Sequence, residues 1–280
     1  MKHPEKWRET ADPFSLPIKK FKITKVLGYP HAGNDVFYVL GEYEGEVEHA
    51  FIKVARQKGA NIEREVKVIN SINFDFLPEI LDYSDDFSVV VTREIEGERL
   101  TSIVGDDMKK SLEYMGEFGE TLAKLHETQT FSSPQIDRKF HHIPSDEVLE
   151  ELRINNLKKW LQDNQPTKTN LCFCHGDFHY ANILWDNGHV SGVLDFELSG
   201  IGNREFDIAW SLIRRPTQKF MKSEREMKEY LKGYSKHGVY DDFLVKYYMV
   251  QIYCYFYQLG RNNPEYQAYV KEWIKNIINE

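Results

Sequence analysis

The chain has 280 residues, enough for one large domain or two lobes, and its 41% hydrophobic and 14% aromatic residues indicate an ordinary globular core. The 44 acidic and 36 basic residues give a net charge of −8, which argues against nucleic acid or an anionic membrane surface as a partner and favours cationic ligands. Three cysteines make no disulfide framework and residues 1–17 hold no apolar signal segment, so we expect a cytoplasmic protein. The sequence gives no sign of an obligate protein partner.

Alternating apolar residues predict five strands in the first third of the chain. The expected strands are 21–27, 36–40, 50–55, 78–83 and 88–92. The loop between the first two, residues 28–35, contains two glycines. Glycines let backbone N–H groups approach a phosphate closely, but on its own this loop is a weak signal and an ordinary hairpin turn is the favoured interpretation.

One lysine, Lys53, lies within the apolar third strand. Burying a lysine is costly unless its ammonium group reaches an anion, so we expect Lys53 to pair with an anion, with a lysine whose ammonium group reaches solvent at the surface as the alternative. A helix follows over 61–69, with Asn61 as its N-cap. Two glutamates on this helix, Glu63 and Glu65, are candidates to hold the lysine in place.

The apolar run stops at residues 93–100, where a glycine interrupts the chain, and we place a lobe boundary there. The predicted lobes are residues 1–95 and 96–280, joined by a hinge at about 93–97. Periodic apolar residues make the second lobe mainly helical. The expected helices cover 107–128, 145–163, 223–236, 241–259 and 264–278. Polar residues interrupt the fourth of these, so it is expected to be a buried helix and not a membrane span.

Three residues with oxygen-bearing side chains, Asp177, Asn182 and Asp195, surround a predicted hairpin. Its strands are expected at 183–185 and 190–194, with an Asn-Gly turn between them. The hairpin returns Asp195 to the neighbourhood of the other two side chains. Carboxylate and amide oxygens are ligands that suit Mg²⁺, and a remaining carboxylate can serve as a base.

Two cysteines beside this loop invite a different interpretation. Cys172 and Cys174 alternate on a short predicted strand, with His175 and His179 close by and His141-His142 elsewhere in the chain. No second cysteine pair supplies the spacing of a closed zinc site. We therefore favour buried residues that support the loop over a zinc centre.

The motifs of the predicted hairpin, His-Gly-Asp at 175–177, Asn182 and Asp-Phe-Glu at 195–197, resemble those of the aminoglycoside phosphotransferase and choline kinase family. The resemblance covers about residues 20–260. It implies an α+β, protein-kinase-like fold of two lobes. The smaller is a β lobe with an antiparallel sheet, and the larger is mainly helical.

The resemblance also implies roles for individual residues. Lys53, held by Glu65, would bind the nucleotide phosphates, while Asn182 and Asp195 would hold Mg²⁺ and Asp177 would accept the proton of the acceptor hydroxyl. The hinge would bind adenine through the Arg93 carbonyl and the Ile95 amide. Two residues, His175 and Asp207, would support the catalytic loop.

The expected function is transfer of the γ-phosphate of ATP, or of GTP as an alternative donor, to a hydroxyl of a small molecule. An aminoglycoside-type antibiotic is the favoured acceptor because it is cationic, which would make the enzyme a resistance factor. Choline, an amino alcohol, a sugar or a macrolide are alternatives, as is an inactive nucleotide-binding module. A protein kinase is disfavoured, because only eleven residues separate Asp195 from Asp207 and they contain no Ala-Pro-Glu element.

Overall fold

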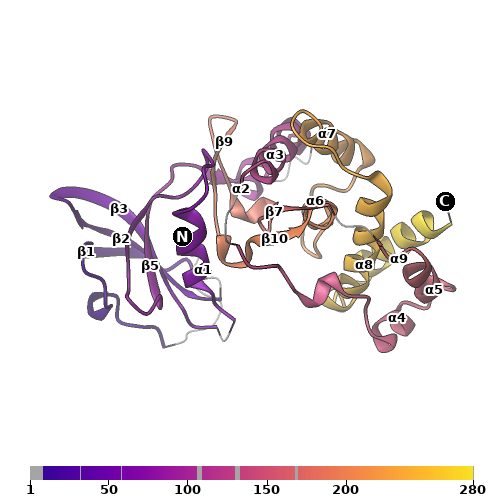
Figure 1. Cartoon of the computed structure of the whole chain (residues 1–280), viewed down its shortest axis with the longest axis horizontal. Coiled ribbons are helices and arrows are strands. Elements are labelled where there is room, and N and C mark those ends of the chain that lie inside the picture. Colours follow the sequence, from indigo (N-terminus) through magenta and orange to yellow (C-terminus); the bar gives the residue numbers. More distant parts are fainter. Residues whose placement is uncertain are drawn as a thin grey trace.

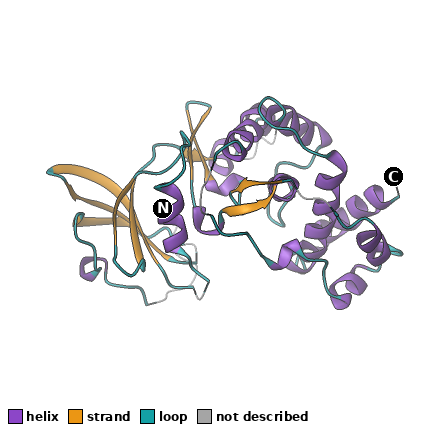
Figure 2. Cartoon of the chain, in the orientation of Figure 1, coloured by secondary structure: helices purple, strands orange, loops and turns teal. Residues whose placement is uncertain are grey.

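The computed structural model describes residues 9–31, 33–57, 59–105, 109–129, 133–167 and 170–279. Strands from the first third of the chain gather at one end, and the helices of the remainder gather at the other (Figure 1). Short strands also lie among those helices, as Figure 2 shows. The α+β, protein-kinase-like architecture predicted from the sequence is confirmed.

A five-stranded antiparallel sheet forms the first part, in the spatial order β1-β2-β3-β5-β4. Its strands are β1 (Lys22–Gly28), β2 (Asp35–Tyr43), β3 (Glu46–Val54), β4 (Ile80–Tyr83) and β5 (Val89–Arg93). One face buries a compact apolar cluster that includes Phe37, Val39, Ala50, Ile52 and Val91. This cluster is separate from the core of the helical part, and we keep the predicted boundary near residue 96 as a proposal.

Helix α1 (Ile62–Ile69) packs across this sheet, where Ile62 and Val66 meet Val90. The side chain of Asn61 caps it by accepting a 3.0 Å hydrogen bond from the Arg64 amide, as predicted. The helix also contacts the turn at 196–198. It therefore connects the sheet to the hairpin region.

The second part is helical and surrounds a core that runs through most of its elements. Its helices are α2 (Leu100–Val104), α3 (Ser111–His126), α4 (Asp146–Leu152), α5 (Leu157–Asp163), α6 (Arg204–Leu212), α7 (Glu224–Tyr234), α8 (Asp242–Leu259) and α9 (Pro264–Ile278). The short strands β6 (Glu98–Arg99), β7 (Leu171–Cys174), β8 (Ile183–Asp186), β9 (His189–Val193) and β10 (Gly200–Asn203) lie between them. Within the described ranges, no helix is long and apolar enough to cross a bilayer.

Helices α3 and α7 lie side by side (Figure 1) because glycines remove side chains from their contact. A Cβ atom on Gly119 would lie 2.0 Å from the Tyr230 carbonyl oxygen, and one on Gly233 would lie 1.8 Å from the Gly116 oxygen. Both distances are well inside van der Waals contact, so only glycine fits. The backbones of the two helices therefore touch directly.

Two of the predicted helices need correction. The helix expected over 145–163 is two helices, α4 and α5, because Arg153 and Asn156 adopt left-handed backbone conformations between them, with φ of 51° and 63°. The helix expected from residue 107 begins at Ser111; Asp107 and Met108 lie outside the described residues. Ser223 and Glu226 form a capping box at the start of α7.

Candidate active site

The predicted hairpin forms as β8 and β9, joined by Asn187 and Gly188 with φ of 49° and 86°. Two consecutive residues with positive φ are characteristic of the tight turns that match the twist of a hairpin. Asp195 follows β9 and also has a positive φ, 70°. This backbone turn directs the chain away from the hairpin just where the predicted metal ligand lies.

Lys53 of β3 lies between two carboxylates from distant parts of the chain. Its Nζ atom lies 2.8 Å from Glu65 Oε2 on α1 and 2.7 Å from Asp195 Oδ1. The lysine side chain is 19% exposed, so burial opposes its charge, but the two carboxylates outweigh burial and raise the pKa of Lys53. The competing residue, Glu63, is instead paired with Lys67 at 2.6 Å on the outer face of α1.

A chain of short contacts joins Asp195 to Asp177. The amide of Leu194, the residue before Asp195, donates to the Asn182 carbonyl at 2.8 Å. The side-chain amide of Asn182 donates in turn to the backbone oxygen of Asp177 at 3.0 Å. Among the described residues no group donates to the Asn182 side-chain oxygen, which leaves this oxygen and the Asp195 carboxylate as donors suited to a hard cation.

The Asp177 carboxylate is fixed by its neighbours. Trp210 Nε1 on α6 donates a 2.7 Å hydrogen bond to Oδ1, and His179 Nε2 lies 3.6 Å from Oδ2. Burial disfavours the carboxylate anion, but His179 and the guanidinium groups of Arg138 and Arg215 outweigh burial and lower the pKa of Asp177. The carboxylate is therefore ionised at neutral pH.

Asp207 lies buried on α6 beneath the loop that carries Asp177. It accepts hydrogen bonds from the His175 amide at 2.9 Å and the Gly176 amide at 3.1 Å. The ring of His175 is also buried, and its Nε2 lies 3.0 Å from the Leu194 carbonyl. The N-cap of α6 is Asn203, whose side chain accepts from the amides at 205 and 206.

The predicted hinge follows β5. The side chain of Arg93 pairs with Glu48 and with Glu79, whereas its carbonyl was the group expected to bind adenine. Within the described chain, the Ile95 amide donates no hydrogen bond. That amide therefore keeps its donor for a ligand, as the predicted hinge contact requires.

Sequence reasoning missed four residues of this region, which are Arg138, Trp210, Arg215 and Glu197. Arg138 donates to the Gly176 carbonyl, and its Cζ lies 4.5 Å from the centre of the Trp210 ring. Arg215 lies 5.4 Å from the same ring. The fourth, Glu197, is linked at 3.3 Å to Asn34 of the predicted phosphate loop, and burial raises its pKa. A signal existed only for Glu197, which directly follows Asp195-Phe196.

The two cysteines form a cluster with a histidine that the sequence had not indicated. Cys172 and Cys174 lie with their sulfur atoms 3.6 Å apart, and His126 completes a group whose ligand atoms lie within 4.8 Å of one another. Both ring nitrogens of His126 already have partners, Tyr234 at 2.8 Å and Asp207 at 3.2 Å. A metal would have to displace one of them, so we retain the interpretation that these residues support the loop.

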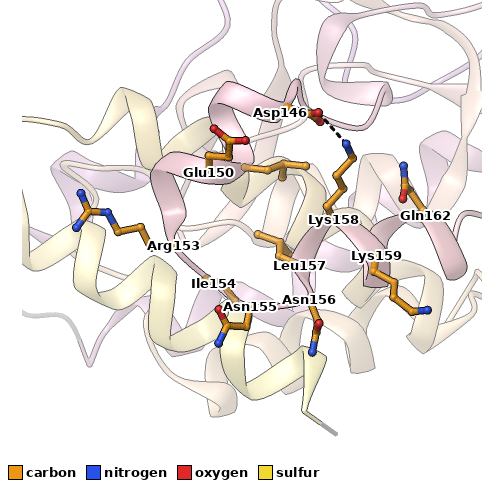
Figure 3. Close-up of a pocket in the computed structure, with 11 residues that line it drawn as sticks. Asp146, Glu150, Arg153, Ile154, Asn155, Asn156, Leu157, Lys158, Lys159 and Gln162 are labelled. Atoms are coloured by element: carbon orange, nitrogen blue, oxygen red, sulfur yellow. Dashed lines mark hydrogen bonds and ion pairs between the residues drawn. The ribbon is translucent and has the colours of Figure 1, made fainter.

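A separate hollow of about 410 Å³ lies between α4 and α5, around the left-handed turn at Arg153 and Asn156 (Figure 3). Charged side chains of both signs border it, and Lys158 pairs with Asp146 across one side at 2.7 Å. None of the residues predicted for catalysis or nucleotide binding lines this hollow. We assign it no part in the chemistry.

A kinase-like fold and an ordered set of Lys, Glu, Asp, Asn and Asp side chains are characteristic of kinase-like phosphotransferases. The model of the phosphotransferase enzyme family matches residues 30–243. The chain belongs to this family.

Individual relatives are distant. A probable aminoglycoside 3'-phosphotransferase of Lactococcus lactis is 22% identical over 179 residues, which are 57% of this chain and 66% of that protein. The chain thus spans just under two thirds of the length of this curated relative.

Solved structures share the fold over most of the chain. A choline/ethanolamine kinase family protein from Mesorhizobium loti is 16% identical with a TM-score of 0.57, and covers 95% of this chain and 88% of its own. The aminoglycoside phosphotransferase APH(4)-Ia, in a ternary complex with AMP-PNP and hygromycin B, is 14% identical with a TM-score of 0.60. That similarity covers 92% of this chain and 94% of the other.

Proposed function

We propose that this protein transfers the γ-phosphate of ATP to a hydroxyl group of a small molecule, with Asp177 as the base. The observation that carries the proposal is the continuous series of contacts from Glu65 through Lys53 and Asp195 to Asn182 and Asp177. This series of contacts brings three kinds of group into one site. They are an ammonium group that can bind phosphates, oxygen atoms that can bind a metal ion, and an ionised carboxylate.

The residues fit a role for each group in such a transfer. Lys53 would bind the α- and β-phosphates, and the Glu65 carboxylate fixes its position. The oxygens of Asn182 and Asp195 would hold Mg²⁺, which neutralises phosphate charge when bound. Asp177, oriented by Trp210, would hold the acceptor hydroxyl and take its proton. Positioning and charge neutralisation supply most of the rate acceleration in phosphoryl transfer.

A protein-kinase role has little support. The eleven residues between Asp195 and Asp207 are occupied by the turn at 196–198 and by β10, and they lead directly into α6. The segment leaves no long loop for presenting a peptide. Family relatives make an aminoglycoside-type acceptor and a role in resistance one candidate, with choline, an amino alcohol, a sugar or a macrolide as alternatives.

The experiment is an acceptor screen that measures ADP release by the wild-type protein and by Asp177→Asn. The variant should bind Mg·ATP with unchanged affinity while kcat falls by ~10²–10⁴, the usual contribution of a positioned general base. Near-normal turnover by Asp177→Asn would remove this residue from the mechanism. Mg·ATP binding without transfer to any acceptor would favour the alternative of an inactive nucleotide-binding module.

A further inference from the structure

Two arginines lie near the predicted base, Asp177, and their positive charge acts on its carboxylate. The guanidinium groups of Arg138 and Arg215 both lie over the Trp210 ring whose nitrogen binds Asp177, with Cζ 4.5 Å and 5.4 Å from the ring centre. Arg138 comes from the segment before η2 (Lys139–His141), and Arg215 comes from the segment after α6. The tertiary fold therefore brings two arginines together at the acceptor end of the site.

Neither arginine forms a direct ion pair within the described part of the chain, although the charge of the Asp177 carboxylate acts on both. Among the described residues, no carboxylate oxygen lies within 4.0 Å of the guanidinium nitrogens of Arg138 or Arg215, whereas Arg93 and Arg261 elsewhere have such partners. Arg138 is bonded to the Gly176 carbonyl, and Arg215 makes only long contacts, 3.4 Å and 3.5 Å, to backbone oxygens. Two half-buried guanidinium groups without a direct ion pair are costly, and an oxyanion is the ligand that best offsets this cost.

The neighbouring residues strengthen this local excess of positive charge. Lys139 follows Arg138 and lies 5.0 Å from the ring centre of Phe140. Arg214 precedes Arg215, and its guanidinium lies 4.8 Å from the ring centre of Tyr269. The protein as a whole has a net charge of −8, and these two pairs of adjacent basic residues, 138–139 and 214–215, contrast with that average.

We propose that the acceptor of this phosphotransferase carries an oxyanion, a carboxylate or a phosphate, which Arg138 and Arg215 bind while Asp177 holds the reacting hydroxyl. This inference rests on the proposed function and specifies its substrate class. It replaces the expectation of a cationic acceptor, which followed from net charge alone. An acceptor with ammonium groups beside its hydroxyl would face two guanidinium groups that have no direct ion pair in the described part of the chain.

The test compares acceptors that share a hydroxyl but differ in charge. Glycolate, ethylene glycol and ethanolamine form one matched set, and glucuronate, glucose 6-phosphate, glucose and glucosamine form another; kanamycin represents the polycations. ADP release should show a kcat/KM at least tenfold higher for the anionic members than for their neutral and cationic counterparts. Comparison of glucuronate with glucose 6-phosphate distinguishes carboxylate from phosphate recognition. A neutral or cationic compound as the best acceptor overturns the inference and leaves the kinase function intact.

Variants separate acceptor binding from other roles of the arginines. Arg215→Gln should raise the KM of the anionic acceptor at least tenfold more than the KM of the neutral analogue, and Arg225→Gln, an exposed arginine on α7, should change neither KM. An equal fall of kcat for every acceptor would instead assign Arg215 to the transferred phosphate or to Asp177, and would overturn the inference. Arg138→Gln is the second variant, although it also removes the bond to Gly176.

Binding gives a readout that does not depend on turnover. In the presence of AMP-PNP and Mg²⁺, calorimetric titration should detect glucuronate or glucose 6-phosphate and not glucose, with affinity reduced at least tenfold in Arg215→Gln. If none of the anionic probes binds the wild-type protein more tightly than its neutral analogue, the inference fails. Failure of AMP-PNP itself to bind would contradict the proposed function instead.

Discussion

Trp210 Nε1 and Asp177 Oδ1 lie 2.7 Å apart, so a buried indole on α6 orients the carboxylate that is proposed to take the acceptor proton. Trp210 also provides the ring beside which Arg138 and Arg215 lie. One side chain thus positions the predicted base and both arginines. An indole donor leaves the carboxylate charged, because it adds a hydrogen bond without a competing formal charge.

Trp210→Phe should test this positioning directly. Phenylalanine retains much of the apolar packing but leaves Asp177 Oδ1 without its donor, which costs about 1–3 kcal/mol for a buried acceptor. We expect kcat to fall about tenfold, in keeping with a loss of about 1.4 kcal/mol, with little change in the KM for ATP. Trp160→Phe, a change at a distant tryptophan stacked on Tyr247, is the matched control. Unaltered kcat in Trp210→Phe would mean that the hydrogen bond has no catalytic consequence.

Lys53→Ala should lower kcat/KM for ATP by at least tenfold, because the only lysine described between Glu65 and Asp195 is lost. Steady-state kinetics with varied ATP provides the measurement. Lys67→Ala is the control, since Lys67 pairs with Glu63 on the exposed face of the same helix. Equal kinetics for the two variants would show that Lys53 is not needed for nucleotide use.

Asp195→Ala should abolish the stabilisation that Mg²⁺ adds in the presence of ATP. A ligand at a hundredfold excess over its Kd stabilises the folded state by ~2.7 kcal/mol, and a metal held by few protein groups plus phosphates depends on the Asp195 carboxylate. Thermal melts with ATP, with and without Mg²⁺, provide the measurement, and Cys172→Ser should respond as the wild type does. A full response of Asp195→Ala, or one equivalent of zinc in the purified protein, would contradict the metal assignment.

Glu120 should contribute to stability in a pH-dependent way. Its hydrogen bond to Lys236, at 2.6 Å, is the main cause that lowers its pKa from 4.5 to about 2. A carboxylate with a lowered folded-state pKa adds stability that is present above about pH 4.5 and is lost as pH falls through about 2. Glu120→Gln should therefore cost about 1 kcal/mol near pH 7, as expected for a partly exposed ion-pair network.

The difference between wild type and Glu120→Gln should shrink as the pH of urea unfolding is lowered from 4.5 towards 2. Glu224→Gln is the control, since Glu224 is 89% exposed and pairs with Lys228 at 3.5 Å within α7. A constant difference across this pH range would show that the charge of Glu120 is not the source of the stability.

The sequence predicted best what depends on local pattern. The Asn-Gly turn, the Asn61 cap and the spacing of Asp177, Asn182 and Asp195 are short-range features, and the family motifs added the expected fold. Left-handed Arg153 was not predictable, because arginine has no preference for that conformation and the periodic apolar residues continue across the break. Tertiary packing sets the boundary between α4 and α5, and the apolar periodicity of the sequence does not reveal it.

The surroundings of Asp177 were also beyond prediction. Arg138 and Arg215 lie 39 residues before and 38 residues after Asp177 (177 − 138 and 215 − 177), and neither belongs to a motif. Only packing against Trp210 places them together. The overall charge of −8 suggested a cationic acceptor. An average over the whole chain, however, carries no information about where the individual charges lie.

The glycine contact between α3 and α7 has a mechanical consequence. A Cβ atom on Gly233 would lie only 1.8 Å from the Gly116 oxygen, so the two helix backbones are in direct contact. The helices therefore cannot slide past each other without steric collision. They must move as one rigid body, and their interface amides should exchange with solvent only on global unfolding. Any opening and closing of the molecule during turnover must then arise elsewhere in the chain, and hydrogen-exchange protection should rise from the proposed hinge at 93–97 toward this helix pair.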